Sequence, residues 1–392
     1  MLTLLRKTYT AIIFAICLGI LTALAVFIRC LRVTHKFPQH PRLIFAGKPI
    51  SGLLSTAQAL RDQGYDVLTI TNAENFIKEG DRFDKSLFPK PDSIFGLGTL
   101  LFAIQHIRLF WQTARHYDVL HGYFNGAIFG AGPLSTKEYG LWKLSGRKLI
   151  LMPYGSDAFV YSKMPDTTWA KTIQETYPHT EKEDLEISAR LSDFSKKADA
   201  IVGCLIHYVN LPHVTINPLL WYPMESLGEA SLPKLKGVIK IVHAPNHRLI
   251  KGTDILIRAV QKLQKKGVNI DLNIIEGQPR DVVIQALKEA DIVVDQIHAG
   301  YALHALEGMS LGKIVVTGIN LKEPVYEPHM SQLESCPLYF CSEATIYTDL
   351  EKIIADRKNW HKRSKAIREY GNKHHSPDVT AMRFMQLYDS FR

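Results

Sequence analysis

Short runs of apolar residues alternate along most of the chain with longer stretches in which apolar residues recur every three or four positions. The short runs predict buried strands, and the three-to-four spacing predicts helices that pack one face against them. In the first half, strands are expected at 42–47, 65–70, 117–122, 147–153 and 198–203, and helices at 53–64 and 97–116. Strands that alternate with helices favour a parallel sheet covered on both faces.

The second half of the chain restarts the same pattern. Strands are expected at 238–246, 270–277, 291–296 and 313–318, and helices at 252–267, 279–290 and 304–312. An irregular stretch with several prolines, 217–237, separates the halves and is interpreted as a linker. The predicted fold class is α/β, with two Rossmann-like domains at 37–216 and 238–345 that face a cleft. The remaining residues, 346–392, are expected to form a basic helical segment.

The N-terminus departs from this pattern. From Thr8 to Ile28 the sequence has 21 residues without a charge, bracketed by basic residues on both sides. A run of this length matches the hydrocarbon thickness of a bilayer and is longer than the apolar core of a signal peptide. We expect residues 1–36 to be an uncleaved, single-pass membrane anchor. The larger basic cluster follows the run, which favours a cytoplasmic position for the two domains.

The amino-acid composition limits the classes of partner that the protein is expected to bind. The chain of 392 residues is 46% hydrophobic and 22% charged, which excludes general disorder, and its formal charge of +9 suits an anionic partner. Between 351 and 375 there are eight Lys or Arg residues against three acidic ones, typical either of a solvated helix face or of contact with anionic lipid. Aromatic residues are not interleaved with these cations as in nucleic-acid-binding segments, so no nucleic-acid partner is expected.

The cysteines give no sign of a metal site or a disulfide framework. Two of the five lie in or beside the anchor, and Cys336 and Cys341 have no second pair at zinc-ligand spacing. A reducing compartment is the simplest interpretation, and we expect neither a metal nor another cofactor.

Polar residues cluster where the strand at 147–153 ends. Tyr154, Gly155, Ser156 and Asp157 follow it directly, and in parallel sheets the loops after the carboxyl ends of strands are where ligands bind. The same residues are ordinary in turns and helix caps, so both interpretations stay open. His121 ends another strand and is a second candidate, although a lone histidine in such a position is more often structural.

Two features of the second half suit an anionic nucleotide. Arg248 and Lys251 lie between a strand end and Gly252, which opens a helix whose free amides attract phosphate; a solvated basic loop is the alternative. Glu307 lies on an otherwise apolar helix, where a ribose diol is a suitable partner for a buried carboxylate, unless the residue simply faces solvent. The glycine of the preceding loop, Gly300, could let backbone amides approach phosphate oxygens.

Three segments, in this order and spacing, resemble the donor-binding domain of the GT-B glycosyltransferases of the family 4-like, group 1 type: HAPNHRLIKGTDILIRAVQKL at 243–263, ADIVVDQ at 290–296 and ALEGMSLGKIVVTG at 305–318. In the first half, MPYGSDA at 152–158 and GKPISGLLSTAQALRDQGYDV at 47–67 resemble loops of the same fold. The resemblance spans about residues 42–320 and is stronger in the second half.

The resemblance implies roles for residues at the matching positions. Arg248 and Lys251 would hold the diphosphate of the donor, Glu307 would accept from the ribose, and Asp157 would lie on the acceptor side with His121 as a further catalytic candidate. The remaining donor-side candidates are Gly252, Gly277, Gly300 and Tyr301. Those of the acceptor and phosphate loops are Gly47, Gly52, Tyr154, Gly155 and Ser156.

Two positions depart from the family pattern. The first of the family's paired glutamates would fall on Ala299, which removes a usual contact to the donor sugar. Arg248 stands only three residues before Lys251, closer than is usual, so Lys251 is the safer assignment.

The implied activity is transfer of a sugar from a nucleotide-sugar donor to a hydroxyl, without a metal and with retention of configuration. The anchor suits a lipid-linked acceptor, as in assembly of a surface polysaccharide or glycolipid, because it holds the protein near that acceptor. A nucleotide-sugar epimerase of the same architecture and a catalytically silent nucleotide-binding protein are the alternatives. The second is suggested by Ala299.

Overall fold

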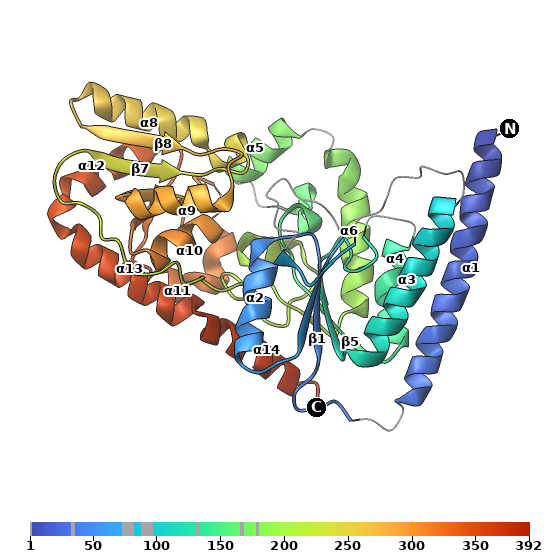
Figure 1. The fold of residues 1–392 in the computed structure, drawn as a ribbon. Helices are drawn as coiled ribbons and strands as arrows, with labels where there is room; N and C mark the ends of the chain where they lie inside the picture. Colours follow the sequence, from blue (N-terminus) through green and yellow to red (C-terminus); the bar gives the residue numbers. More distant parts are fainter. Residues whose placement is uncertain are drawn as a thin grey trace.

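The structure, a computed structural model, describes residues 2–32, 36–72, 82–87, 97–130, 134–164, 168–177, 180–298 and 300–392. Two sheets dominate these residues, and every strand pair in both is parallel. Figure 1 shows the sheets in separate domains, with the apolar N-terminal helix at the far edge of the first. This confirms the predicted α/β architecture of two Rossmann-like domains.

The N-terminal domain has a six-stranded sheet in the order β3-β2-β1-β4-β5-β6. Its strands are β1 (Leu43–Gly47), β2 (Val67–Thr71), β3 (Lys85–Ser86), β4 (Val119–Gly122), β5 (Lys148–Leu151) and β6 (Ala200–Ile201). Its helices are α2 (Ser51–Asp62), α3 (Leu97–His116), α4 (Ser135–Leu144), α5 (Thr168–Thr176) and α6 (Thr180–Lys197). The bounds of α3 agree with the predicted helix, and each predicted strand overlaps an observed one. β3 and helices α4, α5 and α6 are additional elements.

The C-terminal domain has a five-stranded sheet in the order β11-β10-β9-β7-β8. Its strands are β7 (Ile239–His243), β8 (Ile270–Ile274), β9 (Ile292–Val294), β10 (Ile314–Gly318) and β11 (Tyr339–Cys341). Its helices are α7 (Arg248–Lys251), α8 (Thr253–Lys265), α9 (Arg280–Glu289), α10 (Leu303–Ser310), α11 (Met330–Leu333), α12 (Ile346–Ala355) and α13 (Trp360–His375). Buried apolar residues of α8 pack on this sheet, as their spacing predicts.

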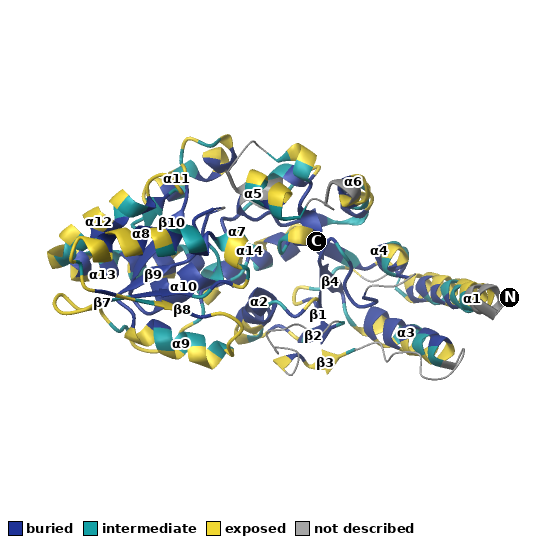
Figure 2. Ribbon diagram, turned by 90° about the horizontal axis from the view of Figure 1, so that it is seen from above, coloured by how far each residue is buried: buried dark blue, intermediate teal, exposed yellow. Residues whose placement is uncertain are grey.

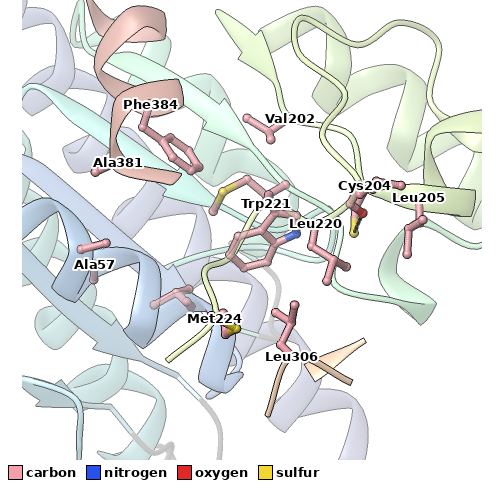
Figure 3. Close-up of a cluster of buried hydrophobic side chains, with 14 of the residues drawn as sticks. Ala57, Val202, Cys204, Leu205, Leu220, Trp221, Met224, Leu306, Ala381 and Phe384 are labelled. Atoms are coloured by element: carbon pink, nitrogen blue, oxygen red, sulfur yellow. Dashed lines mark hydrogen bonds between the residues drawn. The ribbon is translucent and has the colours of Figure 1, made fainter. Parts of the chain in front are cut away.

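The first part of the segment predicted as a linker, residues 218–224, belongs to the core. Trp221 is wholly buried, and its indole N–H donates to the carbonyl of Pro153 at 2.7 Å. Figure 3 shows Trp221 among side chains from both domains, including Ala57 of α2, Val202 and Leu306 of α10. One continuous apolar cluster therefore joins the domains through the linker.

The predicted segment 346–392 divides between the two domains. Helices α12 and α13 pack in the C-terminal domain, whereas α14 (Pro377–Asp389) returns to the N-terminal domain and packs against α2. The chain therefore crosses between the domains twice. The two crossings adjoin each other, because the amide of Met224 donates to the carbonyl of His375 at 2.6 Å.

Helix α1 (Leu2–Leu31) packs against α3 and α4. Its residues Thr8–Leu31 have a mean hydropathy of 2.9, long and apolar enough to cross a membrane. One stripe of α1, which includes Cys17, Leu21 and Ala25, is buried against the domain. In Figure 2, α1 and α3 extend together from the end of the molecule farthest from the C-terminal domain.

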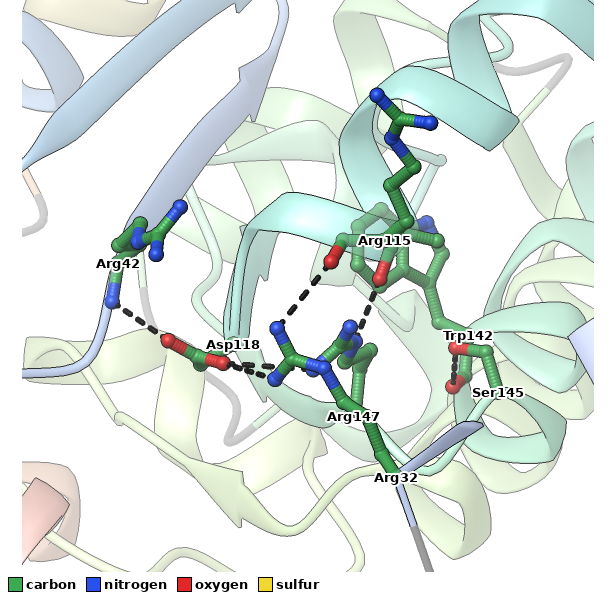
Figure 4. Close-up of polar contacts among 8 residues, drawn as sticks. Arg32, Arg42, Arg115, Asp118, Trp142, Ser145 and Arg147 are labelled. Carbon is green, nitrogen blue, oxygen red and sulfur yellow. Dashed lines mark hydrogen bonds and ion pairs between the residues drawn. The ribbon is translucent and has the colours of Figure 1, made fainter. Parts of the chain in front are cut away.

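A buried ionic cluster joins the end of α1 to the sheet. The carboxylate of Asp118 accepts from Arg32 at 2.6 Å, from Arg147 at 3.3 Å and from the amide of Arg42 at 2.9 Å (Figure 4). The Arg147 side chain is only 4% exposed and also donates to the carbonyl of Ala114. Burial, with Arg32 and Arg42 nearby, lowers the pKa of Arg147 to about 10. Asp118 thus compensates a buried cation and connects α1, β1, β4 and β5.

We expect Asp118→Ala to lower the free energy of unfolding by about 3–5 kcal/mol, because breaking a buried ion pair leaves the Arg147 charge uncompensated. The control is Glu369→Ala, which removes an exposed ion pair with Lys365 and should cost about 0–1 kcal/mol. Both are measured by chemical denaturation of the full chain in detergent. An equal decrease in the free energy of unfolding for the two variants would contradict this role for Asp118.

Candidate functional site

The candidate site lies where the loops at the carboxyl ends of the two sheets meet. In each sheet the order of the strands reverses at one point, between β1 and β4 in the first and between β7 and β9 in the second. Loops after these strands are the usual ligand-binding positions of such sheets. The loops of the two domains approach each other: a Cβ at Gly300, after β9, would lie 3.4 Å from Cδ1 of Leu205, after β6.

On the N-terminal side, two glycines allow close packing of tyrosine rings. A Cβ at Gly47 would lie 2.5 Å from the Tyr123 ring, and a Cβ at Gly52 would lie 2.7 Å from the Tyr222 ring. Any larger residue would displace these rings, so both predicted glycines are required by the packing. Gly47 also has a φ of 143°, which favours glycine.

The predicted loop after β5 is organised by Asp157. The Asp157 side chain is buried, and its carboxylate accepts from the amides of Tyr154 at 3.0 Å, Gly155 at 2.9 Å and Phe124 at 3.1 Å. Burial raises the pKa of Asp157 to about 6, although these three hydrogen bonds oppose the shift. The carboxylate therefore joins the loop after β5 to the loop after β4.

The side chains around Asp157, rather than Asp157 itself, are open to solvent. Ser156 is exposed, and Tyr154 is half-buried with its hydroxyl accepting from Asn125 at 2.8 Å. Lys48 is exposed, and its ammonium lies 5.5 Å from the centre of the Tyr154 ring. These four residues form the accessible polar surface on the N-terminal side.

His121 lies in the core. Its ring stacks on Phe45 at 3.9 Å between centroids, its Nδ1 contacts the carbonyl of Ile44 at 3.1 Å, and its Nε2 contacts the Tyr388 hydroxyl at 2.9 Å. Burial lowers the pKa of His121 to about 3, so the ring is neutral at physiological pH. Both nitrogens are engaged, and the geometry matches the structural alternative stated for this residue.

On the C-terminal side, Lys251 lies at the point where the sheet order reverses. Its ammonium is hydrogen-bonded to the side-chain carbonyl of Gln296 and lies 3.9 Å from Oδ1 of Asp295. The Lys251 side chain is 16% exposed. The other oxygen of Asp295 accepts from the amide of Ala302 and so holds the loop after β9 beside Lys251.

The glycine and arginine neighbours of Lys251 differ in their surroundings. Gly252 has a φ of 72°, and a Cβ there would lie 2.9 Å from Cβ of Ile297, so glycine is required where α7 meets α8. Arg248 is exposed, and its guanidinium pairs with Asp254 at 3.0 Å and with Glu276 at 2.9 Å. Lys251 is therefore the enclosed cation of this pair.

The remaining predicted loop residues are placed as follows. Gly300 has a φ of 79°, and its amide donates to the carbonyl of Gly318 at 2.7 Å. Tyr301 is buried, and its hydroxyl contacts Nε2 of His375 at 2.8 Å, so its side chain faces the core. Gly277 is exposed in a turn with a φ of 64°. Ala299, the departure from the family pattern, lies outside the described residues.

Glu307 lies in a polar cluster that joins α10, α9 and the linker. Its carboxylate contacts Nη2 of Arg280 at 3.0 Å and Nδ1 of His304 at 3.4 Å, and the same Nη2 contacts Glu225 at 3.1 Å. Among the described residues, three buried polar atoms around Glu307 have no hydrogen-bond partner: Nε of Arg280, Nε2 of His304 and Oε1 of Glu225. A bound polar ligand would supply such partners.

Tyr222 lies between the two sides of the site. Its ring packs on Gly52 of α2, and burial, followed by Cys204, Asp295 and Glu307, raises its pKa well above the ordinary value for tyrosine. Asp295, the neighbour of Lys251, and Glu307 thus lie within electrostatic reach of one tyrosine from the linker. A second contact between the sides joins the Tyr177 hydroxyl to Nε2 of His247, just before α7.

The sequence pattern did not indicate most of the residues that surround Lys251 and Glu307. Asp295 stood at the end of a predicted strand and could have been recognised by its position. Glu225 and Arg280 lie 55 positions apart, and no local pattern pairs them. Tyr222 lay in a stretch interpreted as a linker.

The comparisons with known proteins agree with this architecture. No family model and no curated protein sequence matches the chain. Among solved structures, HepE from Anabaena, in complex with UDP and glucose, has 14% identity and a TM-score of 0.59 over 90% of this chain and 100% of that one. Sucrose-phosphate synthase from Thermosynechococcus elongatus has 12% identity and a TM-score of 0.55 over 89% and 98%.

A glycosyltransferase from Rickettsia africae has 12% identity and a TM-score of 0.54 over 90% of this chain and 99% of that one. Each likeness covers both domains of this chain and nearly the whole of the solved structure. The chain therefore has the GT-B fold, with the candidate site between its two parallel-sheet domains.

Proposed function

We propose that the protein is a glycosyltransferase that moves a sugar from a nucleotide-sugar donor to a hydroxyl acceptor. The observation that carries this proposal is that Lys251 lies beside Asp295 where the order of the C-terminal sheet reverses, and that Glu307, in a buried ion pair with Arg280, lies on the helix that follows β9. A cation for a diphosphate and a carboxylate for a ribose are both required to hold such a donor. The GT-B neighbour bound to UDP and glucose supports the same donor class.

In this proposal Lys251 binds the diphosphate of the donor. Negative charge builds on that diphosphate as its bond to the sugar breaks, and a fixed cation stabilises this charge more in the transition state than in the ground state. Asp295 and Gln296 hold Lys251 in place before the donor arrives. As the family resemblance implies, transfer occurs without a metal and with retention.

Glu307 binds the ribose hydroxyls, and Arg280 and His304 complete the nucleoside site. The unpartnered Nε of Arg280 and Nε2 of His304 are available to the nucleoside beside the carboxylate. The Arg280 ion pair orients the Glu307 carboxylate and offsets the cost of burying it, because a buried carboxylate without a partner is unfavourable.

On the acceptor side, Lys48, Asn125, Tyr154 and Ser156 contact the acceptor. Asp157 acts as a positioning residue, because its carboxylate is already engaged by three backbone amides. His121 supports the core beneath β4 in the same indirect way.

Helix α1 anchors the protein to a membrane, with the two domains on the cytoplasmic side and a lipid-linked acceptor within reach. The length and hydropathy of Thr8–Leu31 and the basic residues that follow support this part of the proposal.

The activity is tested by incubating the full chain with a panel of nucleotide sugars and measuring nucleoside diphosphate release with and without membrane lipid extract. Release that requires the extract supports transfer to a lipid acceptor. Release without extract indicates hydrolysis or epimerase-type chemistry, and absence of binding to every nucleotide sugar contradicts the proposal.

We expect Lys251→Ala to weaken binding of the nucleoside diphosphate by about 1.5–3 kcal/mol, the range for hydrogen bonds to charged groups. Calorimetric titration with UDP, GDP and ADP gives the affinity. Lys265→Ala is the matched control, since it removes an exposed lysine at the far end of the next helix, α8, and should leave Kd unchanged. Unchanged affinity in Lys251→Ala would mean that the diphosphate is held elsewhere.

Glu307→Ala should abolish discrimination between a nucleoside diphosphate and its 2′-deoxy analogue. In the wild-type protein the 2′-deoxy form is expected to bind about ten- to a hundredfold more weakly, because the buried carboxylate loses a charge-assisted hydrogen bond. In the variant the two ligands should bind equally. If Glu307 had a purely structural role, the substitution would weaken binding of both ligands and leave the ratio of their dissociation constants as in the wild type.

A further inference from the structure

Charged residues line the edge of the N-terminal sheet where its strands begin, opposite the candidate site. The register pairs Leu43 of β1 with Val119 of β4, and Val119 with Lys148 of β5. Directly before these three paired positions stand Arg42, Asp118 and Arg147. Because neighbouring strands lie about 4.8 Å apart, Asp118 lies between the two arginines. Figure 4 shows Arg42 on one side of Asp118 and Arg147 on the other.

Further cations from the ends of α1 and α3 gather beside this row. Arg32, just after α1, donates to Asp118 at 2.6 Å. The side chain of Arg29, in the last turn of α1, lies over Gly146, with 3.8 Å between its Cγ and the position of a Cβ on that glycine. At the end of α3, the pKa of His116 is lowered by partial desolvation and then by the positive charge of four arginines: Arg115, Arg42, Arg32 and Arg147.

The carboxylates at this edge do not balance the cations. Asp118 already accepts from Arg32, from Arg147 and from the amide of Arg42. Burial and the charge of Arg32 lower the pKa of Arg147 to about 10, although Asp118 opposes the shift. Asp66, which precedes β2 beside Arg42, is exposed and forms no ion pair with another described residue. An excess of positive charge therefore remains.

Two of the guanidinium groups also have donors without acceptors. Nη2 of Arg147 is buried and has no hydrogen-bond partner in the part of the chain that the structure describes. The Arg42 side chain is exposed, and its guanidinium makes no hydrogen bond or ion pair within the described ranges. Because a buried donor without a partner is unfavourable, this cluster suits an anion with several acceptor oxygens.

We propose that Arg32, Arg42 and Arg147 form a binding site for a phosphate-bearing dianion. A guanidinium matches two phosphate oxygens at once, and a dianion balances the excess charge better than a single carboxylate. Two sources have this chemistry: the headgroup of a phospholipid and a soluble phosphate compound. The site lies at the opposite edge of the sheet from the candidate active site, so the inference is independent of the proposed sugar transfer.

Arginine footprinting of the full chain tests this site. Phenylglyoxal, which modifies exposed guanidinium groups, is applied in a neutral detergent with and without inorganic pyrophosphate. In a second arm the protein is reconstituted in vesicles of phosphatidylcholine, alone or with phosphatidic acid. Mass spectrometry of peptides gives the extent of modification at each arginine. Arg258, exposed on α8 in the other domain, is the internal control.

We expect pyrophosphate, phosphatidic acid or both to protect Arg42 from modification and to leave Arg258 unchanged. Protection by pyrophosphate in detergent identifies a soluble phosphate as sufficient. Protection only in vesicles that contain phosphatidic acid identifies the lipid headgroup as the ligand. If neither ligand protects Arg42 more than Arg258, the inference is overturned.

Arg42→Gln should raise the concentration of the protecting ligand that half-protects Arg32 about tenfold or more, because a charge-assisted hydrogen bond is lost. Arg258→Gln is the matched control and should leave that concentration unchanged. Thermal unfolding at the wild-type midpoint checks that both variants keep the fold. The same half-protecting concentration in Arg42→Gln as in the wild type would contradict the site.

Discussion

The burial of the linker between the two sheets is the constraint on which the site depends. Trp221 is enclosed by residues of both domains and donates to the loop after β5, and the next residue, Tyr222, packs on α2 beside the acidic groups of the second sheet. Wholly burying a residue of this size stabilises the fold by several kcal/mol, to judge from the cost of truncating buried Trp or Phe to Ala, about 3–5 kcal/mol. The separation of the proposed donor and acceptor loops is thus fixed by packing at the centre of the molecule.

The charged side chains of the candidate site are paired with one another. Lys251 is held by Asp295 and Gln296, and Arg280 is shared by Glu225 and Glu307. Each cation is therefore oriented before a ligand binds, which reduces the reorganisation that binding requires. Because Glu225 belongs to the linker, the proposed nucleoside side of the site is connected to the segment that joins the domains.

The sequence predicted the architecture well because apolar periodicity reflects burial directly, as the agreement over α3 illustrates. Lys251 and Glu307 could be selected as candidates, since each occupies a fixed place relative to a strand end or helix start, and their roles stay predictions. The surroundings of Asp157 and His121 were not predictable, because a sheet covered on both faces gives no local sign of which side a strand residue faces. Residues 217–237 were interpreted as a linker from their prolines and irregular pattern, although the apolar run Leu219, Leu220 and Trp221, which is buried, indicated that part of the segment belongs to the core.

The double crossing between the domains limits how they can move. The linker and the junction between α13 and α14 lie side by side, joined by the hydrogen bond from Met224 to His375, and a Cβ at Gly371 would lie 2.8 Å from the sulfur of Met224. Two adjoining chain segments allow rotation about a line through both of them but resist sliding of one domain past the other. Opening of the cleft would consequently be a hinge rotation about these two segments. The largest displacements would occur at the loop tips, and residues beside Met224 would hardly move.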